Sequence, residues 1–115
     1  MPRFVVLEHD HPERHWDLLL EAGAVLWAWR LRAPPAPGAT VEAERSFDHR
    51  LMYLDYEGPV SGNRGTVSRW AHGEYAWREQ GEGRLVADIT GPTLSGTLLL
   101  EAIGEGWRAT VLPGR

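Results

Sequence analysis

The segment HDHPERHWDLLLE, residues 9–21, holds three of the five histidines in the chain and sets the expected fold. Residues 14–20 are predicted to form a strand, which would place His15, Asp17 and Leu19 on one face because side chains alternate along a strand. His15 and Asp17 would then lie roughly 6–7 Å apart along the strand, close enough to converge on one ion. His9 precedes a loop marked by Pro12, so the chain can fold back and bring a third ligand to the same place.

Two imidazoles and a carboxylate form a donor set with a definite chemistry. Such a set, with coordination positions left open, suits a catalytic divalent metal ion. Thiolate ligands are excluded because the chain contains no cysteine. The spacing also fits solvated loop histidines near the start of a strand, since histidine is often an exposed or hydrogen-bonded residue. Spacing by itself leaves both interpretations open.

Short apolar runs separated by glycine or proline turns continue outward from this segment. Gly23 and the Trp and Val content of residues 15–30 argue against a helix there. Residues 33–39 are proline-rich and predict a rigid surface loop, and residues 71–73 predict a turn with His72 at a hairpin tip. We expect an all-β fold, a single small antiparallel β-barrel with long connecting loops and at most one or two short helical turns. The predicted strands are residues 3–8, 14–20, 24–30, 40–44, 66–70, 74–78, 84–90, 94–101 and 107–112.

Length and charge limit the classes of protein. A chain of 115 residues predicts a single domain, residues 1–115, that can bury a core without disulfides. A net charge of −4 argues against a protein that coats nucleic acid non-specifically. No apolar run reaches the roughly 20 residues of a membrane span, so we expect a cytoplasmic monomer with no membrane partner. All 12 basic residues are arginine, a side chain suited to bidentate contact with phosphate.

A second informative segment is SFDHRLMYLDYEG, residues 46–58. His49 and Tyr53 are four residues apart, so they would share a face on a helical turn and also on a strand. Either geometry allows the two side chains to serve one site. The alternative for Tyr53 is an amphipathic tyrosine in the core.

The chain resembles the 3′-phosphoesterase domain of bacterial DNA ligase D. That family begins with a strand ending in histidine, a short loop and a His-Tyr-Asp-Phe-Arg-Leu-Glu strand, which residues 4–9 and 15–21 follow with Trp16, Leu18 and Leu19 as exchanges. A later Glu-Asp-His-Pro-Leu-x-Tyr-x-x-Phe-Glu-Gly segment is similar to residues 47–58. A Gly-Thr-Val-x-x-Trp-x-x-Gly-x-Tyr segment is matched by Gly65, Thr66, Val67, Trp70, Gly73 and Tyr75.

The resemblance implies a hydrolase for DNA repair, a stand-alone member of a family that removes 3′-phosphates and 3′-terminal ribonucleotides. It implies Mn²⁺ as the usual cofactor, with other divalent metals as alternatives, held by His9, His15 and Asp17. It further implies that His49 and Tyr53 contact the scissile phosphate. The implied partners are DNA 3′ ends, including primer ends that carry RNA, and the ligase and polymerase of non-homologous end joining.

Departures from the family pattern concern the groups that hold phosphate. Leu19 replaces a family arginine, and Phe47 replaces an acid. Arg30, Arg32 and Arg45 lie near other basic positions of the family and are the candidate phosphate-binding residues. Three hypotheses follow: a 3′-end-processing phosphoesterase, a phosphoesterase for another nucleotide or RNA end, and a non-catalytic module that binds nucleic-acid ends or a protein.

Overall fold

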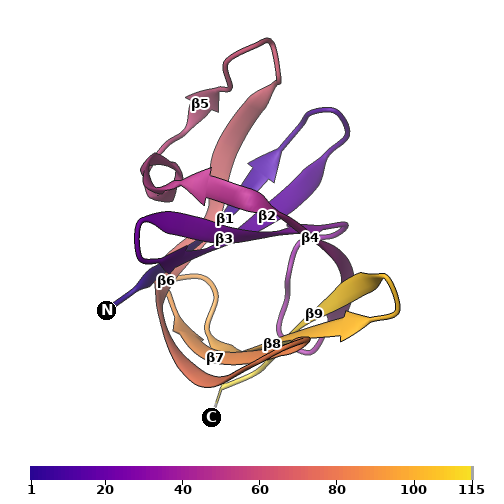
Figure 1. Ribbon diagram of the computed structural model, residues 1–115. Coiled ribbons are helices and arrows are strands. Elements are labelled where there is room, and N and C mark those ends of the chain that lie inside the picture. The colour runs from indigo at the N-terminus through magenta and orange to yellow at the C-terminus, as the bar shows by residue number, and fades with distance from the viewer. Residues whose placement is uncertain (115) are drawn as a thin grey trace.

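The computed structural model describes residues 1–114 and is built almost entirely of strands (Figure 1). Within this range it has nine strands and one short 3₁₀ helix. The elements are β1 Arg3–His9, β2 His15–Ala22, β3 Val25–Leu31, β4 Thr40–Arg50, η1 Leu51–Leu54, β5 Gly58–Pro59, β6 Thr66–Gly81, β7 Arg84–Thr90, β8 Gly96–Ile103 and β9 Gly106–Leu112. Residues 1–114 contain no helix with the length and apolar composition of a membrane-spanning segment.

Eight of the strands close into a barrel. The order along the sheet of residues 1–114 is β1-β2-β3-β4-β9-β8-β7-β6, and a pairing of β1 with β6 joins the two ends. Neighbouring strands pair antiparallel throughout, for example Phe4 opposite Leu20 and Leu98 opposite Val111. β5 pairs only with the start of β6 and lies outside the ring. The predicted all-β antiparallel barrel is confirmed.

Alternation along the strands fills the inside of the barrel with apolar side chains. Leu18 and Leu20 of β2 are buried there with Trp29 of β3 and Leu98 of β8. The large aromatic rings pack edge to face, as Trp29 does against Trp107 at 5.7 Å between ring centroids. Because the barrel is closed, strands from all parts of the chain contribute side chains to this inner core.

A second, smaller apolar cluster lies on the outer face of the β1–β3 sheet. It is formed by Val5 and Leu7 of β1, Leu19 of β2 and Leu26 and Ala28 of β3. Leu54 of η1, Val67 of β6, and the partly buried Tyr53, Tyr56 and Val60 pack over these side chains. Figure 1 shows η1 and the β5 segment on the same side as the β1–β2 hairpin. This part of the sheet is therefore buried on both faces, and the outer cluster forms a floor on which polar side chains can be placed.

The predicted turn at residues 71–73 is wrong, because β6 runs without a break from Thr66 to Gly81. His72 pairs with Val5 in the middle of the strand and does not lie at a hairpin tip. A Cβ at Gly73 would lie 2.1 Å from the carbonyl oxygen of Thr90. Glycine here allows a close backbone approach, a use that sequence cannot distinguish from a turn.

β4 is longer than the predicted residues 40–44 and contains a β-bulge. Ala28 pairs with Ser46 and Leu26 with His49, so one residue of β3 faces two residues of β4, Phe47 and Asp48. The extra residue places His49 on the outer face and changes the direction of the neighbouring side chains. The proline-rich residues 33–39 form a loop as predicted, with one isolated bridge from Pro37 to Val111.

Candidate metal and phosphate site

The β1–β2 hairpin places His9, His15 and Asp17 together on the outer face of the barrel. His9, the last residue of β1, pairs directly with His15, the first residue of β2. Nδ1 of His9 lies 3.6 Å and Nε2 of His15 lies 3.2 Å from Oδ2 of Asp17. One donor atom from each of the three residues lies within 4.8 Å of the other two. The fold-back predicted for His9 is thus achieved by strand pairing.

The other nitrogen of each imidazole is held by a backbone carbonyl. Nδ1 of His15 lies 2.9 Å from the carbonyl oxygen of Glu13, and Nε2 of His9 lies 2.8 Å from that of Arg64. A carbonyl only accepts, so each of these nitrogens donates its proton. In the neutral imidazole the remaining nitrogen then carries a lone pair, and both lone pairs face Asp17. Such orienting contacts are typical of histidines that bind metal.

Burial and the neighbouring negative charge shift the pKa of His15 in opposite directions. His15 and Asp17 are 5% and 4% exposed. Burial lowers the pKa of His15, but the hydrogen bond and negative charge of Asp17 outweigh it, so the pKa is raised overall. The Asp17 carboxylate therefore stabilises positive charge on the His15 imidazole.

The loop that supplies the Arg64 carbonyl is anchored to the β1–β2 hairpin. The Thr66 amide donates to Oδ1 of Asp10 at 2.7 Å, and this contact lowers the pKa of the Asp10 carboxyl. Gly65 has a positive φ of 76°, and a Cβ on it would lie 2.2 Å from Oδ1 of Asp10. Glycine is required for this approach, and the approach brings the preceding carbonyl to His9.

His49 and Tyr53 face the same pocket from β4 and η1. Nδ1 of His49 donates to the carbonyl oxygen of Phe47 at 2.9 Å, which leaves Nε2 as the other functional nitrogen. The rings of His49 and Tyr53 meet edge to face at 5.9 Å between centroids. The two residues span the end of a strand and a 3₁₀ turn, a combination of the two geometries considered from sequence.

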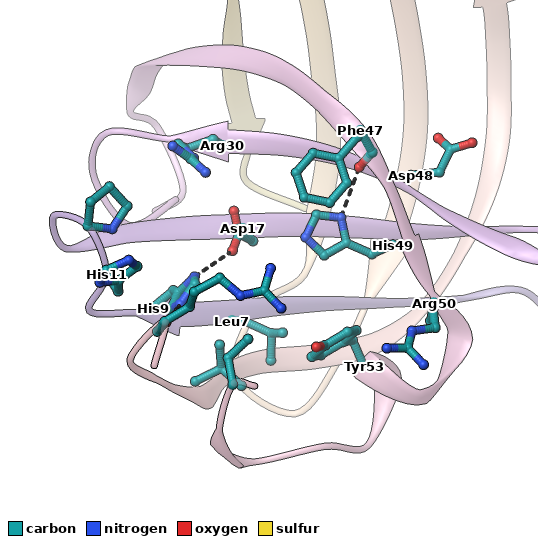
Figure 2. A pocket seen from close by; sticks show the side chains of 14 residues that line it. Leu7, His9, His11, Asp17, Arg30, Phe47, Asp48, His49, Arg50 and Tyr53 are labelled. Atoms are coloured by element: carbon teal, nitrogen blue, oxygen red, sulfur yellow. Dashed lines mark hydrogen bonds and ion pairs between the residues drawn. The ribbon is translucent and has the colours of Figure 1, made fainter. Parts of the chain in front are cut away.

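A pocket of about 470 Å³ joins His9 and Asp17 to His49 and Tyr53 (Figure 2). In Figure 2, His9 and His11 lie at one end, His49 and Tyr53 lie at the other, and Asp17 lies between them. Its lining residues come from β1, the loop between β1 and β2, β2, β3, β4, η1, the loop before β6 and the start of β6. They are Leu7, His9, His11, Pro12, Asp17, Arg30, Phe47, Asp48, His49, Arg50, Tyr53, Val60, Arg64 and Val67.

The three candidate arginines have different surroundings. Arg30 pairs with Asp17 across β2 and β3 and lines the pocket. Arg32 lies in a neighbouring hollow of about 380 Å³ that also contacts His15, and its guanidinium is 3.6 Å from Glu42 and Glu44. The Arg45 guanidinium lies 4.3 Å from the ring centroid of Trp29, whose side chain belongs to the inner core, so Arg45 is outside the pocket.

Sequence reasoning missed two arginines that line the pocket, Arg50 and Arg64. Arg50 ends β4 directly after His49, and that adjacency was the one available signal. Arg64 belongs to the 62–65 turn, and only the pairing of β6 with β1 brings this turn to the site. Both positions depend on contacts between segments far apart in sequence.

Leu19 lies on the same strand face as His15 and Asp17 but takes part in the apolar floor. It is fully buried, with 0% exposure, and packs in the cluster with Val5, Leu7 and Ala28. The side chain two residues after Asp17 therefore supports the site from below and offers no polar group to it.

A comparison with protein families and curated proteins adds an independent observation. The family model described as "DNA Ligase D 3′-phosphoesterase domain" matches residues 7–106, which include every residue of the pocket. No curated protein matched the chain.

Proposed function

The chain belongs to the DNA ligase D 3′-phosphoesterase domain family, and on this basis we propose that it is a metal-dependent hydrolase for the 3′ ends of DNA. The family suggests a 3′-phosphoesterase role in DNA repair. The reaction that we propose is removal of a 3′-phosphate or a 3′-terminal ribonucleotide. The observation that carries the proposal is that His9 and Asp17 line one pocket with His49, while His15 meets Asp17 at 3.2 Å beside that pocket.

The donor atoms fit a divalent cation. Bonds of about 2.0–2.2 Å to nitrogen and oxygen place adjacent ligand atoms roughly 2.8–3.6 Å apart in octahedral or tetrahedral geometry. The 3.2 and 3.6 Å separations around Oδ2 of Asp17 agree with this range. We propose Mn²⁺ as the resident ion, since mixed imidazole and carboxylate ligands with no thiolate suit such metals. When bound, the ion would polarise a phosphoryl oxygen and acidify a water molecule.

His49 is the proposed catalytic residue on the side of the phosphate that faces away from the metal ion. Its Nδ1 proton is engaged by the Phe47 carbonyl, so Nε2 carries the exchangeable proton. As an imidazolium, His49 can donate from Nε2 to a phosphate oxygen or protonate the leaving oxygen. The Tyr53 hydroxyl can donate a further hydrogen bond, because this side chain lines the same pocket.

Arginines from three parts of the chain line the pocket that would hold the phosphate. Arg30 comes from β3, Arg50 from the end of β4 and Arg64 from the turn before β6. Guanidinium groups bind phosphate through charge-assisted hydrogen bonds, each worth about 1.5–3 kcal/mol. We propose that these three arginines neutralise the substrate in place of a charge at position 19.

An end-processing assay tests the proposal. A labelled primer-template that ends in a 3′-phosphate or in one 3′-ribonucleotide is incubated with protein and Mn²⁺, Mg²⁺ or chelator. We expect loss of the phosphate or ribonucleotide with Mn²⁺ and no reaction with chelator. His15→Ala should be inactive, whereas His72→Ala, a matched change outside the pocket, should retain activity.

The proposal fails if the folded protein binds Mn²⁺ but releases no product from either end. Product that forms equally with His15→Ala would also contradict it, because the reaction would then be independent of the donor set.

A further inference from the structure

Phe47 is a large apolar side chain exposed at the edge of a polar pocket. It is 70% exposed and lines the pocket together with His49. The two rings are stacked nearly parallel, with centroids 4.8 Å apart and planes inclined by 5° (Figure 2). Because His49 covers one face of the phenyl ring and most of the side chain is exposed, the opposite face is open to solvent.

The β4 bulge explains why this ring reaches the pocket. In a regular strand, the side chains of neighbouring residues point to opposite faces. β4 carries one extra residue between Ser46 and His49, and this residue breaks the alternation. Bulges often redirect a side chain beside a functional site. The backbone carbonyl of Phe47 also accepts the Nδ1 proton of His49, so the ring and the proposed catalytic imidazole are fixed to each other.

We propose that the open face of Phe47 is a stacking site for the nucleobase of the 3′-terminal nucleotide, an inference that rests on the proposed function. Aromatic rings beside arginines are a recurring arrangement for nucleotides, because the ring binds the π-face of the base while the guanidinium binds phosphate. Phe47 shares its pocket with Arg30, Arg50 and Arg64. The terminal base rests on Phe47, and its 3′-phosphate extends toward the Nε2 side of His49.

Stacking of the terminal base on Phe47 also determines which substrates the site prefers. Stacking is tolerant of sequence, since every base has a π-face, so the four bases should bind with similar strength. A terminal nucleotide without a base should lose the contact. The substrate class is therefore a nucleotide end with its base present, in contrast to phosphate on an abasic sugar or a small phosphomonoester.

The first experiment compares two oligonucleotides that end in a 3′-phosphate, one with a normal terminal base and one with an abasic terminal sugar. We expect kcat/KM of the native protein to be roughly 5- to 150-fold higher with the base present, the range for one base stacked on an aromatic ring. Phe47→Ala should remove this preference, and Phe47→Trp should keep it. Trp70→Ala, an exposed aromatic residue outside the pocket, is the matched control and should leave the preference unchanged.

Two results would overturn the inference while leaving the phosphoesterase intact. One is an unchanged preference for the base in Phe47→Ala. The other is an equal fall of kcat on both oligonucleotides, which would mean that Phe47 only positions His49.

A binding measurement separates this inference from the proposed function. An oligonucleotide with a 3′-terminal 2-aminopurine and a 3′-phosphate reports stacking through its fluorescence, whether or not turnover occurs. Quenching by native protein and Phe47→Trp, but not by Phe47→Ala, would support the stacking site even for a protein with no phosphoesterase activity. Equal quenching by all three proteins, or none by the native protein, would refute it.

Discussion

The two faces of β2 have opposite uses although their residues alternate in one strand. Leu18 and Leu20 point into the barrel and join a core that includes strands from both ends of the chain. His15, Asp17 and Leu19 point outward, where the first two join His9 in the candidate donor set and the third is part of the apolar floor. The inner face is completed by closure of the barrel, with Leu94 added from the loop between β7 and β8. The outer face needs η1, the 62–65 turn and the β4 bulge to become a site.

The plane of the sheet thus separates the residues that determine stability from those that determine the chemistry. A substitution on the inner face should reduce the free energy of unfolding and leave the chemistry of folded molecules unchanged. A polar substitution on the outer face should do the reverse. The small apolar cluster beneath the site is the exception, because it serves both purposes.

The largest effect is expected for His49→Ala. Loss of a proton donor in the transition state should lower kcat by about 10²- to 10⁴-fold, with little change in Mn²⁺ affinity. Unfolding should be nearly unaffected, since His49 is not part of the buried inner core. Steady-state kinetics and urea unfolding measure both quantities. A variant that retains native kcat would place the chemistry elsewhere in the pocket.

The pair Leu18→Ala and Leu19→Ala tests the boundary between the two faces. Both side chains are almost fully buried, so each truncation should cost about 2–5 kcal/mol of unfolding free energy. Only Leu19→Ala should also weaken Mn²⁺ binding in the folded fraction, because its cavity lies beneath the donor set. Urea unfolding combined with Mn²⁺ titration at low temperature provides the comparison.

If an alanine variant does not fold, Leu18→Met and Leu19→Met repeat the test at nearly constant volume. Equal loss of Mn²⁺ affinity at both positions would contradict the separation of the faces.

Two glycines of β6 test the corrected path of that strand. Gly73→Ala should destabilise the barrel by about 1–3 kcal/mol, because the new methyl group would collide with the Thr90 backbone. Gly81→Ala on the same strand meets nothing closer than 3.6 Å and should change stability by less than about 0.5 kcal/mol. Thermal unfolding of the two variants is sufficient. Equal stability would show that residue 73 does not need this close approach.

The smallest effect concerns the ion pair between Arg3 and Asp55, which ties η1 to the start of β1. The hydrogen bond from Arg3, at 2.6 Å, lowers the pKa of Asp55 below its ordinary value of 3.8. A lowered pKa in the folded state means that the contribution is present above the ordinary value and is lost as pH falls through the lower one. Native protein should therefore be slightly more stable than Asp55→Asn at neutral pH, and the two should converge in strong acid. Unfolding midpoints followed across this range would contradict the assignment if their difference did not depend on pH.

Much of the fold follows from local sequence patterns. Residues 84–90 form a strand with the predicted bounds, and the 3–8, 14–20 and 24–30 predictions lie within one or two residues of β1, β2 and β3. Alternation and the Gly23 turn were enough because each hairpin closes over a few residues. The same reasoning failed at Gly73, because glycine is needed there for the close approach of the Thr90 backbone on a neighbouring strand.

The clustering of His9, His15 and Asp17 was predictable for the same local reason, because the three residues belong to one hairpin. The positions of the arginines were harder to predict from the sequence. Arg30 could be placed through its neighbours, but Arg45 packs over Trp29, on the other side of the sheet. Arg50 and Arg64 reach the pocket through the β4 bulge and the β6–β1 pairing, neither of which has a local sequence signal.

A titration with Mn²⁺, in which free Mn²⁺ is measured by electron paramagnetic resonance, tests whether His9, His15 and Asp17 bind the metal. Asp17→Asn removes the carboxylate that contacts both imidazoles, and Asp48→Asn changes a carboxylate in the same pocket outside the donor set. We expect one Mn²⁺ to bind per native chain and per Asp48→Asn chain, and binding to Asp17→Asn to be weakened more than about 100-fold, since losing even an outer partner of a ligand costs 10- to 100-fold. Equal affinity of Asp17→Asn and native protein, with both folded, would contradict the assignment of His9, His15 and Asp17 as the metal site.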